Sequence, residues 1–166
     1  MPLFSYKFCM LFKFNYAKSV LYAKNHSNKK NYFYKVFEGN DESVNFVSQC
    51  IFAGCENFKS NSCKDWFYEN ENCYSESWVD SQKLLSFLLN RSTCGPFGRI
   101  EKVQGVSAGD VIFDVKDEEK TVYGLVSRME NGEIFYISSQ FGLGEKVLKA
   151  EELMGKIFIH ILGLNK

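Results

Sequence analysis

Apolar side chains recur every three or four residues in three stretches of the N-terminal half of the chain. These stretches run from Phe14 to Asn25, from Glu42 to Phe52 and from Asp80 to Leu89. Such spacing collects apolar side chains on one side of an α-helix. The pattern therefore predicts three helices, and the second is expected to be the central one.

After Gly98 the spacing changes to the alternation that is typical of β-strands. The candidate strands are Val111 to Val115, Thr121 to Ser127, Glu133 to Ser138 and Lys156 to Leu162. Asn131-Gly132 separates two of them and is a strong hairpin signal. Helices that precede strands predict an α+β fold. Since no internal repeat or linker is visible, residues 1–166 are interpreted as one domain.

Turn residues mark the expected ends of these elements. Asn40 or Asp41 is the candidate N-cap of the central helix, and Gly54 fits its C-terminal stop. Gly95-Pro96 lies in a turn-rich connection from Asn90 to Gly98. The polar stretch from Glu56 to Ser77 shows no clear period, so no element is predicted there.

Composition and charge argue against a disordered chain and against a nucleic-acid-binding protein. The chain is 45% hydrophobic and 16% aromatic, which argues against disorder. Its 20 basic and 20 acidic residues cancel, so we expect no nucleic-acid partner and no strong global field that would attract an anionic membrane. A basic cluster at Lys24, His26, Lys29 and Lys30 is interpreted as a solvated helix end.

The N-terminal residues are apolar, but their apolar run is too short for a transmembrane helix or an export signal. No apolar run approaches the roughly 20 residues of a transmembrane helix. Lys7 and Lys13 interrupt the segment from Met1 to Phe14, which we expect to be folded structure. A cytoplasmic location is favoured, with a secreted or cell-wall location as the alternative. An exposed patch of Phe4, Phe8, Leu11 and Phe12 would instead indicate a structural or assembly role.

The chain has six cysteines but no Cys-x-x-Cys pair, so no metal site and no cofactor are predicted. We expect six reduced thiols that are mostly buried. Cys63 and Cys73 flank a polar loop and are the pair that could be bridged in an exported protein.

The segment Glu42-Ser43-Val44-Asn45-Phe46-Val47-Ser48-Gln49 carries the clearest motif. It resembles the Asp-Cys-Thr-Asn-Phe-Val-Ser-Gln segment of the bacterial Putative amidase domain family, a branch of the papain-like cysteine hydrolases. Tyr22-Ala23, Asn31-Tyr32 and Ala108 to Ile112 match further segments of that family in the same order. The resemblance covers about residues 14–163, and residues 1–13 form an extension. It implies a papain-like or NlpC/P60-like fold, with N-terminal helices packed on a C-terminal antiparallel sheet.

The departures from the family lie at the positions that carry its chemistry. Ser43 stands where members have the nucleophilic Cys, and Tyr123 stands where they have the general-base His. Gln140 falls near a further His of many members. A serine becomes a nucleophile only when a base removes its proton. Tyrosine has a pKa near 10 and glutamine does not titrate, so neither residue supplies that base.

The resemblance therefore implies an amidase-like domain that has lost catalysis and binds a peptide, a cell-wall-derived ligand or a protein partner. Its expected binding residues are Glu42, Asn45, Gln49, Trp66 and Trp78. Two alternatives stay open. One is an active amidase or peptidase with Ser43 as the nucleophile, and the other is the structural or assembly role. His26 and His160 are the only histidines, and both are expected to be structural or exposed.

Overall fold

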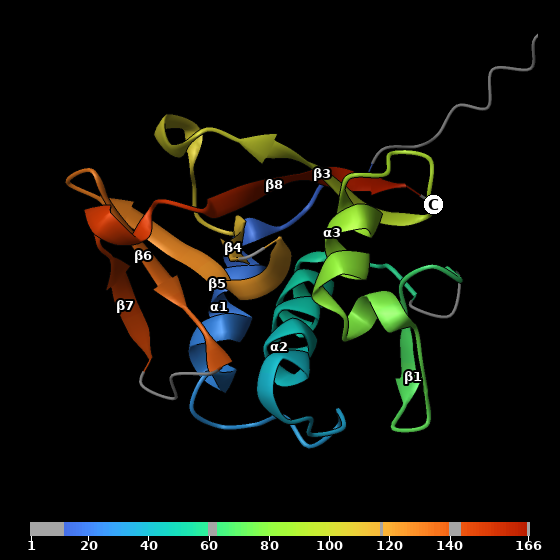
Figure 1. Ribbon diagram of the computed structural model, residues 1–166. Coiled ribbons are helices and arrows are strands. Elements are labelled where there is room, and N and C mark those ends of the chain that lie inside the picture. Colours follow the sequence, from blue (N-terminus) through green and yellow to red (C-terminus); the bar gives the residue numbers. More distant parts are fainter. Residues whose placement is uncertain (1–11, 60–62, 117, 140–143, 166) are drawn as a thin grey trace, which may run out of the picture.

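A computed structural model of the chain describes residues 12–59, 63–116, 118–139 and 144–165. Three α-helices lie on one face of a six-stranded antiparallel sheet, and a short hairpin extends beside the third helix (Figure 1). The mixed α+β class, with helices first and the sheet later, is confirmed.

The three helices form where the apolar spacing predicts them. Helix α1 spans Tyr16–His26, α2 spans Gly39–Gly54 and α3 spans Ser81–Leu88. The Asn15 side chain accepts a hydrogen bond from the Lys18 amide and caps α1. Asp80 caps α3 in the same way through the Lys83 amide. These side chains satisfy amide groups that would otherwise lack partners at the helix starts.

Helix α2 differs from its prediction at its start. The expected caps, Asn40 and Asp41, lie inside the helix, which begins at Gly39 with Glu38 as its N-cap. Glu38 makes no capping side-chain hydrogen bond. Every residue from Ser43 to Ile51 is buried, so α2 is enclosed on all sides. It contacts α1, α3 and the sheet and is the central helix, as predicted.

The sheet has the strand order β3-β8-β4-β5-β6-β7, and every neighbouring pair is antiparallel. The strands, in chain order, are β3 Gly95–Glu101, β4 Val111–Lys116, β5 Glu119–Glu130, β6 Glu133–Ile137, β7 Glu145–Leu148 and β8 Lys156–Asn165. Asn131 and Gly132 join β5 to β6 with φ of 50° and 81°. These angles are typical of the predicted two-residue hairpin turn.

Four further strands of the described chain were not predicted. Strand β3 occupies the stretch that was read as a turn, because Gly95-Pro96 lies on an edge strand where a missing amide donor is tolerated. Strand β7 forms the other edge. A hairpin of β1 (Tyr68–Asn70) and β2 (Cys73–Tyr74) interrupts the polar stretch.

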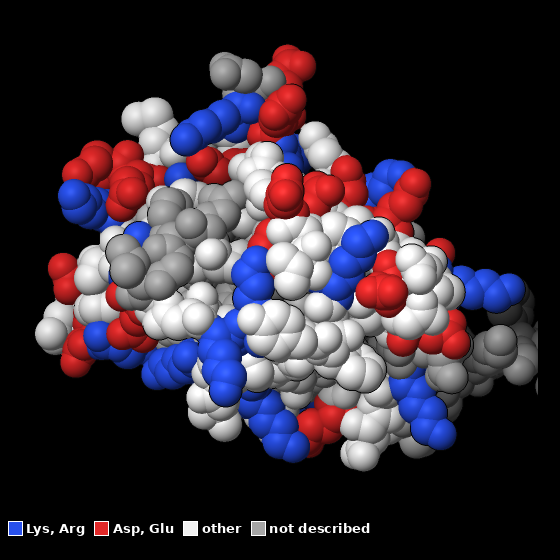
Figure 2. Space-filling model, turned by 90° about the horizontal axis from the view of Figure 1, so that it is seen from below, with Lys and Arg blue, Asp and Glu red and all other residues white. Residues whose placement is uncertain are grey.

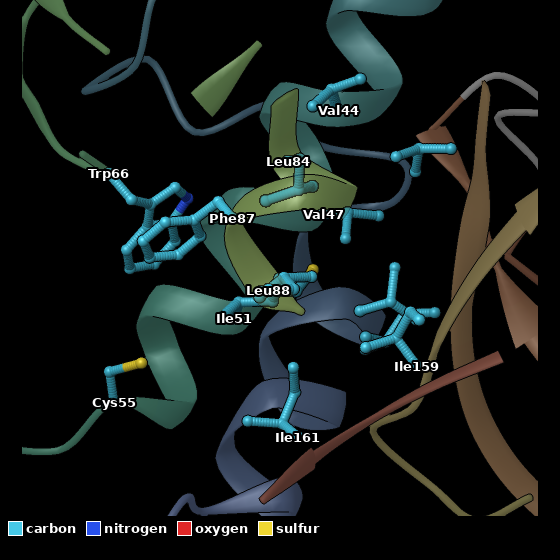
Figure 3. Packing of buried hydrophobic residues seen from close by; sticks show 14 of the residues in the cluster. Val44, Val47, Ile51, Cys55, Trp66, Leu84, Phe87, Leu88, Ile159 and Ile161 are labelled. Carbon is cyan, nitrogen blue, oxygen red and sulfur yellow. The ribbon is translucent and has the colours of Figure 1, made fainter. Parts of the chain in front are cut away.

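Side chains on the two faces of the sheet belong to two apolar cores. The helix-side core joins the helices to Val111, Phe113, Ile159 and Ile161, and Figure 3 shows the last two directed towards α2 and α3. The outer-face core is smaller and is built by Val106, Ile112, Val126, Ile134, Tyr136, Leu148 and Phe158. Residues alternate between the two cores along β4, as a pleated strand requires.

The cysteines correct one expectation. Cys63 and Cys94 form a disulfide, with Cα atoms 5.5 Å apart, so the prediction of six reduced thiols is wrong. Cys73, the partner proposed from sequence, is free. Cys50 and Cys55 are free and buried, as expected. Cys9 lies outside the described residues, as do Phe4, Phe8 and Leu11 of the apolar N-terminal patch.

Within the described part of the chain, none of the helices has both the length and the apolar character needed to cross a bilayer.

Candidate functional site

Ser43 is the fifth residue of α2, and its surroundings decide what its hydroxyl can do. The residue is 2% exposed. Its Oγ atom is buried and has no hydrogen-bond partner among the described residues. A hydroxyl becomes a nucleophile when a neighbouring base accepts its proton, and that contact is missing at this position.

Glu42 and Asn45 fix the chain that precedes α2. The Glu42 carboxylate accepts a hydrogen bond from the Phe37 amide at 2.9 Å and a longer one from Asn45 Nδ2 at 3.3 Å. Asn45 Nδ2 also donates to the Lys35 carbonyl at 3.0 Å. The Trp78 indole N–H donates to Asn45 Oδ1 at 3.0 Å. These two motif residues therefore tie residues 35–37 and Trp78 to the first turns of α2.

Gln49 takes part in a second internal network. Its Oε1 atom accepts a hydrogen bond from the Tyr22 hydroxyl at 2.6 Å, and that hydroxyl accepts one from Asn31 Nδ2 at 3.0 Å. Burial raises the pKa of Tyr22, so the phenol keeps its proton and acts as a donor. Gln49 therefore joins α1 to α2 and to the loop between them.

The two tryptophans lie inside the helix-side core. Both are 0% exposed, and their ring centroids are 4.8 Å apart. Figure 3 shows Trp66 stacked beside Phe87 of α3, with ring planes 15° apart. The Trp66 indole N–H has no partner among the described residues. Neither ring is placed to meet a ligand from solvent.

The structure does not bring Tyr123 and Ser43 together. Tyr123 packs against the outer-face core, whereas its neighbour Val122 packs into the helix-side core. The Tyr123 hydroxyl donates to Glu152 Oε1 and accepts from the Tyr136 hydroxyl, each at 3.3 Å. Lys156 Nζ lies 4.2 Å from the centroid of the Tyr123 ring.

The register of β5 explains this orientation. A bulge interrupts the β4–β5 pairing, so Ile112 faces Gly124 and Phe113 faces Val122. Tyr123 lies at the bulge, and its side chain points to the outer face. Burial, together with the neighbouring Tyr136 and Glu152, raises the pKa of Tyr123. Gln140, the third position expected from the family, lies outside the described residues.

Both histidines have other partners. His26 Nδ1 lies 3.1 Å from the Lys29 carbonyl oxygen, and its ring is 4.3 Å from that of Tyr22. His160 Nδ1 lies 2.7 Å from Asp110 Oδ1, and its Nε2 lies 3.3 Å from the Tyr16 hydroxyl. That hydroxyl donates to the Ile161 carbonyl.

The Asp110–His160 pair was not predicted from sequence. Asp110 was expected to order a turn, and it does so by accepting a hydrogen bond from the Ser107 amide at 2.9 Å. Burial raises the Asp110 pKa despite hydrogen bonds from Ser107 and His160. The pairing of Val111 with Ile159 in neighbouring strands brings the two residues together, and that pairing has no sequence signal.

A hollow of about 240 Å³ lies where α2, α3 and β5 begin. Its lining is polar and acidic: Asn40, Asp41, Asp80, Ser81, Gln82, Glu119, Lys120 and Thr121. Asp80 already caps α3 there. In the described part of the chain, no three or more histidine, cysteine or acidic side chains gather where they could hold a metal ion.

Comparison with known proteins gives one match. A family model described as Putative amidase domain matches residues 13–138. The match runs from the residues before α1 to the end of β6 and contains Ser43 and Tyr123, whereas His160 lies beyond it. Searches of the curated proteins and of the solved structures found no match.

Proposed function

This chain belongs to the Putative amidase domain family, and we propose that it is a non-catalytic member that serves as a binding module. The proposal covers the loss of hydrolysis and the retention of a fold that presents a binding surface. We also propose that the domain has a papain-like fold. The packing of a central helix against an antiparallel sheet supports this assignment.

The observation that carries the proposal is the state of the Ser43 hydroxyl. It is buried and has no hydrogen-bond partner among the described residues. Attack on an amide carbonyl requires contact with the substrate and a base for the proton. Loss of the nucleophile or the base in a comparable triad lowers turnover by about 10⁴-fold or more.

The positions of the possible bases give further support. Tyr123 turns its ring to the outer face of the sheet. His160 is held by Asp110 and by Tyr16 of α1, and no hydrogen bond joins its ring to Ser43 among the described residues. The alternative of an active hydrolase that uses Ser43 would need a base supplied from outside the described residues.

The motif residues suggest how the domain can bind a partner without hydrolysing it. Glu42 and Asn45 hold the backbone of residues 35–37, and Gln49 reaches Asn31 through Tyr22. Trp78 stacks on Tyr34 of the same region, and Trp66 packs against Trp78 inside the core. We propose that these five residues shape the loop before α2, and that the loop itself contacts the peptide, cell-wall-derived ligand or other partner.

The disulfide changes the expected location. The preference for the cytoplasm rested in part on reduced thiols, and Cys63 and Cys94 are bonded. Disulfides are typical of proteins in oxidising compartments. We therefore propose that the domain works outside the cytoplasm, at the cell surface or in the cell wall.

The test is amide hydrolysis by the purified chain on peptidoglycan fragments and a small peptide panel. Three proteins are compared: the natural chain, Ser43→Ala and Ser43→Cys. We expect no turnover above the Ser43→Ala background for any of them, because Ser43→Cys restores a thiol without a base. Turnover by the natural chain that disappears in Ser43→Ala would overturn the proposal.

A further inference from the structure

The loop between α1 and α2 exposes two neighbouring aromatic rings. Tyr32 is 84% exposed and Phe33 is 73% exposed, and Val36 nearby is 46% exposed. The loop runs along the lower side of the molecule in Figure 1, which is the side that Figure 2 views directly. Large apolar side chains that gather on one surface indicate a contact site rather than ordinary surface composition.

The backbone that carries these rings is held at several points. Asn31 accepts hydrogen bonds from the Phe33 and Tyr34 amides through its side chain and its carbonyl. The Lys35 amide donates to the Tyr68 hydroxyl at 2.7 Å. Beneath the loop, the Tyr34 ring stacks on Trp78. The exposed rings are therefore presented by a fixed backbone, which lowers the entropic cost of binding.

Residues 24–37, which comprise the end of α1 and the loop that follows it, carry a local positive charge in a chain whose net charge is +0. Residues 24–37 contain four lysines and His26 but no aspartate or glutamate. Lys30 pairs with Glu42 at 3.6 Å across the edge of the segment. Figure 2 shows several lysine and arginine side chains next to the uncharged surface on this side of the molecule, with aspartate and glutamate side chains at other parts of its border.

The adjoining hollow is too small to take a substrate. It is bordered by His26, Lys30, Asn31 and Lys35 and has a volume of about 40 Å³. Small-molecule sites enclose roughly 300–1,000 Å³. A partner of this segment therefore meets outward-facing side chains over a broad surface.

We propose that residues 24–37 bind the surface of an anionic phospholipid membrane. Tyr32 and Phe33 enter the headgroup region, and the lysines contact lipid phosphates. Aromatic rings favour this interface, and lysines near it are attracted electrostatically to anionic headgroups. Phe33 and Val36 carry no hydrogen-bonding side-chain group, so an apolar boundary suits them better than a polar polymer does.

The inference rests on the proposed binding role and names its partner, but it does not depend on the loss of hydrolysis. Vesicle binding and amide turnover are separate measurements. If the protein neither binds vesicles nor hydrolyses amides, the membrane proposal is rejected and the non-catalytic proposal stands. If the protein hydrolyses amides and also binds vesicles, the non-catalytic proposal is rejected and the membrane proposal stands.

The experiment is co-sedimentation of the full chain with vesicles of phosphatidylcholine, with and without phosphatidylglycerol, at low and high salt. We expect binding to the anionic vesicles, weakened by salt. Lys24→Gln with Lys29→Gln should weaken it by about 25-fold, because each lysine near the surface contributes about fivefold. Tyr32→Ser with Phe33→Ser should weaken it at both salt concentrations.

The matched control is Lys102→Gln with Met154→Ser, which removes an exposed lysine and an apolar side chain that is 88% exposed. Both sites lie outside the loop between α1 and α2. This variant should bind as the natural chain does. Phe33→Trp provides a second readout, since its fluorescence should shift to the blue on anionic vesicles.

Three results would overturn the proposal: no sedimentation with anionic vesicles, equal binding to both vesicle types, or an equal loss in the control variant. Binding to a single-stranded RNA oligonucleotide in place of vesicles would also overturn it and would assign the segment to nucleic acid.

Discussion

The two faces of the sheet use buried polar side chains in different ways. On the helix side, Asn45 and Ser48 each bond to the backbone of a neighbouring segment. On the outer face, the Asp114 carboxylate meets the Lys156 ammonium at 2.9 Å, and both side chains are nearly buried. The polar groups of the helix side thus fix the chain path through bonds to the backbone, and the outer face contains a buried ion pair between side chains.

The comparison also separates Ser43 from Tyr123, the two positions that the sequence resemblance predicts to match catalytic residues. Ser43 is enclosed on the helix side and has no hydrogen-bond partner in the described part of the chain, whereas Tyr123 lies on the outer face beside Lys156. A reactive pair requires hydrogen-bond contact, and Ser43 and Tyr123 make no such contact with each other among the described residues. The polar residues that remain in the motif are the ones that hold the loop before α2.

The largest expected effect lies in the helix-side core. Trp78→Ala should lower the free energy of unfolding by about 3–5 kcal/mol, because it removes a buried ring and leaves a cavity. Trp78→Phe keeps a ring and loses the hydrogen bond to Asn45, so it should cost about 1–2 kcal/mol. Urea unfolding measures both. A loss below about 1 kcal/mol for Trp78→Ala would contradict the claim that burial of this ring stabilises the helix-side core.

The buried ion pair provides the next effect. Lys156→Met should cost about 3 kcal/mol, because it leaves the Asp114 carboxylate buried beside an exposed partner. That partner, Lys116, lies 3.3 Å from Asp114 and is 79% exposed. Lys116→Met is therefore the matched control, with an expected cost below about 1 kcal/mol. Equal losses for the two variants would show that burial does not distinguish them.

The same pair predicts a dependence on pH. Burial tends to raise the Asp114 pKa, but hydrogen bonds from Lys156 and Lys116 outweigh it and hold the pKa below its ordinary value. The carboxylate therefore stabilises the fold above about pH 4, and this contribution is lost as the pH falls through the lowered pKa. Asp114→Asn should flatten the fall in unfolding free energy at acid pH. Parallel curves for the two proteins would contradict the assignment.

The smallest effect distinguishes two serines on one helix. Ser48→Ala should cost about 1 kcal/mol, because the Ser48 hydroxyl donates to the Trp78 carbonyl at 3.0 Å. Ser43→Ala removes a buried hydroxyl without a partner, so it should be neutral or stabilise the fold by up to about 1 kcal/mol. Thermal unfolding of both variants tests this order. A clear loss for Ser43→Ala would show that its hydroxyl has a partner.

Periodicity along the chain was sufficient to predict the three helices, four of the six sheet strands and the turn at Asn131-Gly132. These features depend on local spacing and on backbone preferences that neighbouring residues impose. Strand β3 was missed because Gly95-Pro96 is a turn signal in isolation, and only its place at the sheet edge makes it a strand.

The family motif was also readable from sequence, because it occupies one continuous helix. Contacts between distant segments were not. The Cys63–Cys94 disulfide spans 31 residues, and Asp110 meets His160 only through strand pairing. The direction of Tyr123 depends on a bulge in β5. Local sequence thus determined the three helices, four strands and the family motif, whereas tertiary pairing decided the edge strands, which side chains meet and which face each one occupies.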